Sequence, residues 1–150
     1  MQAIFYEGKL EDNYIGHQIK EVYFDKIYEP YLLGKSGLTI VDIGANIGVT
    51  AHYFSQFASR VYALDPALEH YTVLTNMLAF NKLENVIPIK KAIYIKSGEY
   101  PFFHNRNRTA WSLHMAVDDK SGKEEMVDCI TLEDLVKQQK IEHIDLLKVD

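Results

Sequence analysis

The sequence predicts an α/β fold with a mostly parallel sheet and helices on both of its faces. Short apolar runs, which are typical of buried strands, alternate with apolar residues at helical spacing through the first half of the chain. A glycine-containing turn, GANIG at residues 44–48, follows the first apolar run, and Asp65-Pro66 follows the second. Alternation of this kind is typical of parallel strands joined by helices.

The first helix and the first strand are predicted from apolar spacing. Residues 10–33 carry apolar side chains at helical intervals and predict an amphipathic helix. Pro30 disfavours helix at the residue before it, so this helix is expected to end near Glu29. A turn, GKSG, follows, and the apolar run Leu38–Ile43 predicts a buried strand.

Two more helices and two more strands are predicted next. Apolar residues from Val49 to Phe57 recur at helical spacing, and residues 60–64 form a short apolar run. Pro66 suits the first position of a helix, which is expected to end near Asn81. Residues 85–93 predict a third strand.

The second half of the chain is less regular. Residues 92–103 alternate around Ser97-Gly98 and predict a hairpin. No clear pattern is visible between residues 105 and 119, and residues 125–130 predict another strand.

The last helix and strand are predicted at the C-terminal end. Thr131 and Asp134 resemble a capping box, which indicates that a helix starts there and runs through Val136. The run IDLLKVD at residues 144–150 predicts a buried strand that reaches Asp150.

Composition argues against several classes of protein. The chain has 150 residues, 47% of them hydrophobic, which suits one domain with a sizeable core. A net charge of −5 argues against a broad nucleic-acid-binding face. No apolar run approaches the roughly 20 residues that span a membrane, and the N-terminus lacks the pattern of a signal peptide. The single cysteine, Cys129, cannot form an internal disulfide, so a cytoplasmic location is expected.

The turn at residues 44–48 does not match the common nucleotide-binding motifs. A dinucleotide fingerprint, G-x-G-x-x-G, would need glycine at Asn46 and at Val49. A Walker A loop would need G-K-[ST] after the turn, which is missing. The turn is therefore expected to hold a ligand near its backbone, but not a pyrophosphate.

The residues around the turn point to an amino acid ligand. Gly44 lets the chain turn sharply, and Gly48 lets the next helix pack closely or start tightly. The carboxylate of Asp42 would repel a phosphate and attract an ammonium group. The nearby helix N-terminus favours a carboxylate. The alternative is a tight strand-to-helix turn that holds no ligand.

Asp65 indicates that the ligand also contains a ribose. It follows the second predicted strand, about 20 residues beyond the turn, where an acid can accept hydrogen bonds from ribose hydroxyls. An amino acid joined to a ribose describes S-adenosylmethionine. The alternative role for Asp65 is that of a helix N-cap ahead of Pro66, and both roles could coexist.

The chain resembles a known family. VDIGANIGVTAHYFSQFASRVYALDP at residues 41–66 is similar to the opening motifs of class I S-adenosylmethionine-dependent methyltransferases, and more narrowly of the FkbM type. DCITLEDLV at residues 128–136 and IDLLKVD at residues 144–150 match the same family, so the resemblance covers roughly residues 38–150. One departure is Asp65, because the family usually has Glu before the proline.

The resemblance implies a Rossmann-like methyltransferase domain at residues 37–150, with residues 1–36 as an N-terminal helical extension. It implies that the turn surrounds the methionine end of the cofactor, that Asp65 holds the ribose, and that the residues after the third strand line the adenine pocket. The cofactor-binding set is Asp42, Gly44, Ala45, Asn46, Gly48, Asp65, Pro66, Lys91 and Ala92.

The family pattern continues beyond the point where this chain ends, which implies an incomplete C-terminal half. A sheet that stops at its fourth parallel strand would expose an apolar edge, so a homodimer that covers this edge is expected. By resemblance, Asp150 ends the strand beside the first one and is the candidate catalytic base. The alternative is a solvated terminal acid with no catalytic role.

Three functions are considered, from the most to the least favoured. The first is a methyltransferase that acts on a hydroxyl of a sugar or small metabolite, where the acceptor class rests on the resemblance alone. The second is a non-catalytic domain that binds the cofactor, and the third is a nucleotide-dependent oxidoreductase. No metal is expected, because the six histidines lack close ligand spacing.

Overall fold

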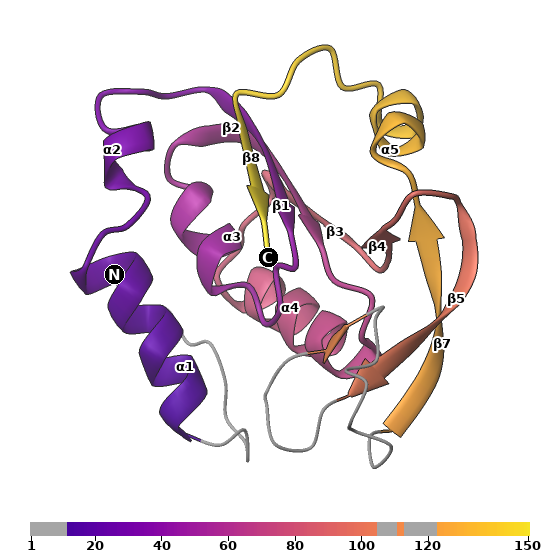
Figure 1. The fold of residues 1–150 in the computed structure, drawn as a ribbon. Helices are drawn as coiled ribbons and strands as arrows, with labels where there is room; N and C mark the ends of the chain where they lie inside the picture. The colour runs from indigo at the N-terminus through magenta and orange to yellow at the C-terminus, as the bar shows by residue number, and fades with distance from the viewer. Residues whose placement is uncertain (1–11, 105–110, 113–122) are drawn as a thin grey trace.

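The computed structural model describes residues 12–104, 111–112 and 123–150 (Figure 1). Its first sheet has the strand order β3-β2-β1-β8, and each pair of neighbours is parallel. The prediction of a parallel sheet is therefore confirmed. The strands are β1 Leu38–Ile43, β2 Ala58–Leu64, β3 Val86–Ile89 and β8 Leu146–Val149.

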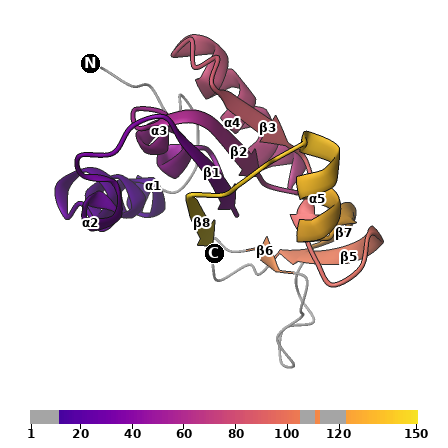
Figure 2. The same cartoon turned by 90° about the horizontal axis from the view of Figure 1, so that it is seen from above.

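Helices cover both faces of this sheet, as predicted (Figure 2). Successive strand residues point to opposite faces. Ile40 packs in one core cluster with α3, Val49–Phe54, and α4, Leu68–Phe80. Val41 packs in a second cluster with α5, Leu132–Gln139, on the other face.

The N-terminal segment differs from the single helix that was predicted. It contains α1, Asp12–Ile19, a π-helical turn η1, Lys20–Phe24, and the short helix α2, Glu29–Leu32. The helix ends at Phe24 rather than near Glu29, because Lys26 adopts a left-handed conformation with φ 55°. Pro30 lies in the first turn of α2, where its missing N–H group costs no hydrogen bond.

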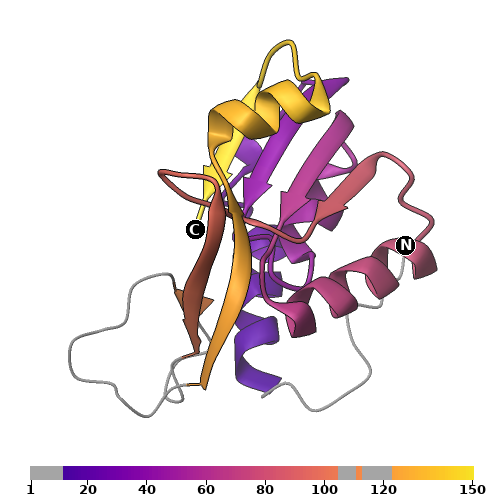
Figure 3. The same cartoon turned by 90° about the vertical axis from the view of Figure 1, so that its right-hand side faces the viewer.

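A second sheet, which the sequence did not predict, lies beside the first (Figure 3). Its strand order is β4-β7-β5-β6, and its strands are β4 Ala92–Ile93, β5 Gly98–His104, β6 Trp111–Ser112 and β7 Lys123–Ile130. The predicted hairpin around Ser97-Gly98 is wrong, because β7 lies between β4 and β5.

The third predicted strand, at residues 85–93, is interrupted because the chain passes there from the first sheet to the second. The Lys91 N–H donates to the carbonyl of Ile89 at 2.9 Å, which closes a tight turn at the end of β3. The chain leaves the first sheet there and pairs Ala92 with Cys129 in the second sheet. A strand predicted over residues 85–93 is therefore divided between two sheets.

Helix starts were predicted with mixed success. Thr131 Oγ1 accepts a hydrogen bond from the Asp134 N–H at 3.0 Å, so the predicted cap of α5 is confirmed, and the helix runs to Gln139. The helix expected to begin at Pro66 begins at Leu68. Its N-cap is Ala67, whose N–H donates to Asp65 Oδ1 at 3.1 Å.

Among the described strands, β8 lies at one edge of the first sheet, as predicted. Leu147 and Val149, which share one face of β8, are 42% and 66% exposed. The unpatterned stretch between residues 105 and 119 lies outside the described residues apart from Trp111 and Ser112 of β6. In the described part of the chain, no helix combines the length and the apolar character that crossing a membrane would require.

Candidate functional site

The candidate site lies at the carboxyl ends of β1, β2 and β8. Because these strands are parallel, their carboxyl ends share one edge of the sheet. The chain runs from β1 outward to β2 and β3 on one side and returns to β8 on the other, so the strand order reverses at β1. Ligands of open α/β sheets bind at such a reversal. The C-terminus lies beside the turn that follows β1 (Figure 1).

The 44–48 turn needs three left-handed residues. Gly44, Asn46 and Gly48 have φ values of 74°, 52° and 97°. The N–H groups of Gly44 and Ala45 donate to the carbonyl of Leu64 at 2.9 and 2.8 Å, which binds the turn to the end of β2. The start of the turn is therefore committed to the protein's own backbone.

Gly48 allows α4 to pack closely against the turn. A Cβ atom at Gly48 would lie 2.3 Å from Met77 Cε and 2.7 Å from Leu74 Cδ1, both on α4. The close packing that Gly48 permits is therefore with α4, whereas the sequence predicted it for the helix that directly follows the turn.

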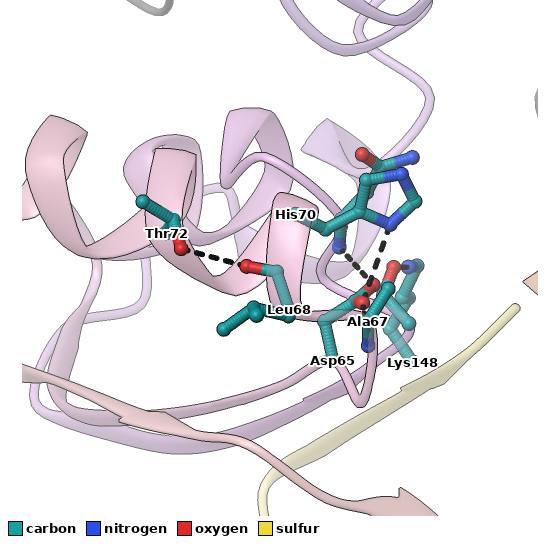
Figure 4. Close-up of polar contacts among 8 residues, drawn as sticks. Asp65, Ala67, Leu68, His70, Thr72 and Lys148 are labelled. Atoms are coloured by element: carbon teal, nitrogen blue, oxygen red, sulfur yellow. Dashed lines mark hydrogen bonds and ion pairs between the residues drawn. The ribbon is translucent and has the colours of Figure 1, made fainter. Parts of the chain in front are cut away.

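Asp65 connects the turn to the start of α4 (Figure 4). Its Oδ2 accepts a hydrogen bond from the Asn46 N–H at 2.9 Å, and its Oδ1 accepts one from the Ala67 N–H at 3.1 Å. His70 Nδ1 lies 3.3 Å from the same Oδ1. Asp65 is only 5% exposed, and it is not the N-cap itself.

Asp42 is fully buried at the end of β1. Its Oδ2 accepts a hydrogen bond from Thr50 Oγ1 at 2.5 Å, and its Oδ1 lies 3.1 Å from Lys148 Nζ. Burial raises the pKa of Asp42, while the Lys148 ammonium and the Thr50 hydroxyl oppose that rise. The effect of burial is the larger, so the pKa of Asp42 is raised overall, and its two oxygens face Lys148 and Thr50.

Lys148 is the buried charged residue of the candidate site that the sequence analysis did not single out. It lies directly opposite Asp42 in the β1–β8 register, and its side chain is 7% exposed. Burial lowers the pKa of Lys148, but the carboxylates of Asp42 and Asp150 outweigh that effect and raise it overall. A lysine inside an apolar run signals a buried partner, and Asp42 in the neighbouring predicted strand was the available anion.

Asp150 lies at the mouth of the turn. Its Oδ2 is 3.3 Å from Lys148 Nζ, and its side chain is 67% exposed. Its N–H donates to the carbonyl of Ile43 at 3.2 Å. A Cβ atom at Gly44 would lie 3.1 Å from Asp150 Cβ, so the glycine leaves room for this aspartate.

The remaining predicted residues lie toward the second sheet. Pro66 is buried beside Asp65. Lys91 Nζ lies 3.2 Å from Asp128 Oδ2 of β7. Ala92 is buried in a cluster that includes Ala67. The structure thus brings Asp42, Gly44 and Asp150 together around Lys148, and it joins Asn46 to Asp65, while Lys91 pairs with the second sheet.

Comparison with protein families identifies the chain. A sequence model described as the methyltransferase FkbM domain matches residues 42–150, which is more than half of the chain. The chain belongs to the FkbM methyltransferase family. Membership of this family gives the site its cofactor, S-adenosylmethionine. A search of curated proteins found no match.

Several solved structures resemble parts of the chain. An S-adenosylmethionine-dependent methyltransferase from Aquifex aeolicus is 24% identical, with 55% of this chain and 48% of that chain covered and a TM-score of 0.44. The SMU.1697c protein from Streptococcus mutans, solved in complex with SAH, is 18% identical, with 45% and 40% covered and a TM-score of 0.42. The YcgJ protein from Bacillus subtilis is 21% identical, with 51% and 30% covered and a TM-score of 0.43. The matched part of this chain spans less than half the length of each of these proteins.

The donor and acceptor groups of the site fit the cofactor. A carboxylate oxygen accepts about two hydrogen bonds. Among the described residues, Asp65 Oδ1 has Ala67 and His70 as partners, whereas Oδ2 accepts only from Asn46 and can accept one more, as from a ribose hydroxyl. The exposed carboxylate of Asp150 suits an ammonium group. No group of three or more His, Cys, Asp or Glu within the described ranges could hold a metal ion.

Proposed function

We propose that this chain carries the cofactor-binding part of a methyltransferase that acts on a hydroxyl of a sugar or small metabolite. Family membership supports the methyltransferase class, and the acceptor class rests on the resemblance to FkbM-type enzymes. The observation that carries the proposal is the buried Asp65 carboxylate, which ties the 44–48 turn to α4 and keeps one acceptor position for a ligand hydroxyl.

Each part of the cofactor has a proposed set of residues. Asp65, next to Pro66, accepts a hydrogen bond from the ribose, and the 44–48 turn lies against the amino acid end. Lys91 and Ala92 line the adenine side, a proposal supported by the packing of Ala92 in one cluster with Ala67. Bound S-adenosylmethionine supplies an electrophilic methyl group on a sulfonium.

Asp150 is the proposed base for the transfer step. When the acceptor oxygen forms its bond to the methyl carbon, the sulfur–carbon bond breaks and the hydroxyl proton must leave. An exposed carboxylate at the mouth of the turn can orient that hydroxyl and take its proton. The chain's main contribution to the rate is then alignment, together with this proton transfer.

A domain that binds the cofactor without transferring the methyl group is the second candidate. One observation favours it: Asp150, the proposed base, is already paired with Lys148, with Oδ2 3.3 Å from Nζ. A nucleotide-dependent oxidoreductase is disfavoured, because Asn46 and Val49 carry side chains where a dinucleotide site has glycines.

Calorimetry with two ligands tests the proposal. We expect saturable binding of S-adenosylhomocysteine and no saturable binding of NAD. Binding of NAD alone would overturn the proposal in favour of an oxidoreductase. If S-adenosylhomocysteine binds but no hydroxylated acceptor is methylated when S-adenosylmethionine is supplied, the second candidate is supported.

We further propose a homodimer that covers the edge of β8 and acts in the cytoplasm. The exposed apolar side chains of Leu147 and Val149 support the dimer, since an unpaired apolar edge strand favours association. The single cysteine supports the reducing compartment. Sedimentation equilibrium tests the dimer, and a monodisperse monomer at micromolar concentration would contradict it.

A further inference from the structure

Three charged side chains form a compact group at the ends of β1 and β8. Lys148 lies between two carboxylates, with Nζ 3.1 Å from Asp42 Oδ1 and 3.3 Å from Asp150 Oδ2. Asp42 and Lys148 lie on two neighbouring strands, 106 positions apart in the sequence, and Asp150 directly follows β8. We call them the Lys148 cluster.

Lys148 has no N–H group left for a ligand. Besides the two carboxylates, its ammonium lies 2.8 Å from the carbonyl of Gly44 and 3.2 Å from the carbonyl of Ile43. An ammonium group has three N–H bonds, and these four acceptors already compete for them. Any effect of Lys148 on a ligand must therefore pass through the groups that it holds.

The charge of the cluster is unevenly exposed. Two carboxylates and one ammonium leave a net charge of −1. Asp42 is fully buried and faces Lys148 and Thr50, whereas the Asp150 side chain is 67% exposed. The uncompensated charge therefore lies at Asp150, and the buried Asp42 has no oxygen directed to solvent.

We propose that Lys148 is a positioning residue of the cofactor site. It neutralises Asp42 and anchors Asp150 beside Gly44, so that the exposed negative charge of the cluster attracts the ammonium end of an amino acid ligand. This inference rests on the proposed function. It assigns Asp150 to binding of the cofactor, and the ligand comparison below distinguishes this role from that of a base, because a base that acts only on the acceptor would leave the affinity for S-adenosylhomocysteine unchanged.

The close approach of Gly44 and Asp150 supports this assignment independently of charge. A side chain at Gly44 would begin 3.1 Å from Asp150 Cβ and 3.5 Å from its carbonyl oxygen. The turn therefore packs closely against Asp150, and Lys148 contacts the carboxylate of the same residue.

Two ligands that differ in their amino acid part test the inference. S-adenosylhomocysteine carries an ammonium and a carboxylate, whereas 5′-methylthioadenosine lacks both and keeps the ribose and adenine. Calorimetry at pH 7 measures both affinities for the wild type, for Asp150→Asn and for the double variant Asp42→Asn/Lys148→Met. The double variant removes the buried cation together with its buried anion, which avoids an uncompensated charge in the core.

We expect both variants to bind S-adenosylhomocysteine about tenfold more weakly. Asp150→Asn removes the charged partner of the ammonium, whereas the double variant keeps that charge and removes the lysine that fixes its position. Binding of 5′-methylthioadenosine should stay within about twofold of the wild type. The control is Lys137→Met, which removes an exposed lysine paired with Glu133 and should change neither affinity.

The outcomes separate the inference from the proposed function. If both ligands weaken equally in the double variant, Lys148 has a structural role only and the inference is overturned. Unchanged affinity for S-adenosylhomocysteine in either variant would overturn it as well, and Asp150→Asn gives this result even if the double variant fails to fold. A wild type that binds neither ligand would overturn the proposed function, and the inference with it.

Discussion

The carboxyl ends of β1 and β2 each carry a buried aspartate, and the two carboxylates have different kinds of partner. One faces a buried cation, and the other accepts hydrogen bonds from backbone N–H groups. Asp42 at the end of β1 is paired with the ammonium of Lys148 and the hydroxyl of Thr50. Asp65, just after β2, is held by the backbone N–H groups of Asn46 and Ala67, with His70 nearby.

This difference decides which acid can serve a ligand. A carboxylate neutralised by a buried cation contributes to the architecture, and its charge is cancelled where it lies. A carboxylate held by backbone N–H groups keeps its full charge in a fixed orientation. We therefore infer that Asp42 acts on a ligand only through the groups that it holds, whereas Asp65 offers a ligand a direct acceptor.

Removing Asp42 should give the largest effect on stability. We expect Asp42→Ala to lower the free energy of unfolding by about 3 kcal/mol, because it leaves Lys148 and Thr50 buried without their main acceptor. Urea denaturation measures this change. The matched control is Asp128→Ala, whose exposed pair with Lys91 should contribute less than about 1 kcal/mol. Equal losses in the two variants would mean that the β1 end is not a buried ion pair.

Removing Asp65 should act mainly on binding. We expect Asp65→Ala to weaken S-adenosylhomocysteine binding by about 1.5–3 kcal/mol, the contribution of a hydrogen bond to a charged group. Stability should fall as well, since the N–H groups of Asn46 and Ala67 lose their acceptor. The control is Glu69→Ala, an exposed acid in the first turn of α4. Unchanged affinity in Asp65→Ala would remove the ligand role from the β2 end.

The turn that joins the two ends can be tested through its glycines. A methyl group at Gly48 would meet Met77 and Leu74 of α4, whereas one at Gly37, which has a similar φ of 72°, would meet nothing within 4 Å. We expect Gly48→Ala to cost about 1–3 kcal/mol more than Gly37→Ala, because both share the backbone strain and only one overpacks. Thermal unfolding of the two variants measures the difference, and equal costs would show that strain alone matters.

The sequence located Asp65 more readily than the pairing of Asp42 with Lys148. Asp65 could be located because it follows an apolar run and precedes a proline, which are local signals. The pairing of Lys148 with Asp42 depends on the β1–β8 register, which joins residues 106 positions apart and has no local signature. The parallel direction of the strands in the first sheet followed from the alternation of strands and helices, whereas the position of the last strand beside the first was implied by the family resemblance.

The second sheet could not be predicted for the same physical reason. Ala92 and Ile93 continue an apolar run, yet they pair with Cys129 and Ile130 rather than with β2. Apolar alternation gives the period of a strand but not the identity of its neighbour. The turn at Lys91, closed by one backbone hydrogen bond, separates the two sheets without a glycine or a proline to mark it.

Another buried titratable group near the turn, His52, can be tested through the dependence of stability on pH. His52 of α3 is buried, and its Nδ1 is hydrogen-bonded to the Tyr23 hydroxyl of η1. Burial lowers the pKa of His52. The unfolded chain therefore binds this proton first, so the contribution of His52 to stability is complete above about pH 6.5 and is lost as the pH falls from there through the folded pKa.

We expect the wild type to lose stability between pH 7.5 and pH 5.5 more steeply than His52→Gln, by at most about 1.4 kcal/mol per pH unit for one proton. Urea denaturation of both proteins at each pH measures the difference, and Tyr23→Phe serves as the control because it removes the hydrogen bond and keeps the histidine buried. If the two pH profiles are parallel, His52 is not held neutral by burial. In that case the buried groups on this side of the sheet would tolerate charge, as Asp42 and Lys148 do by forming an ion pair.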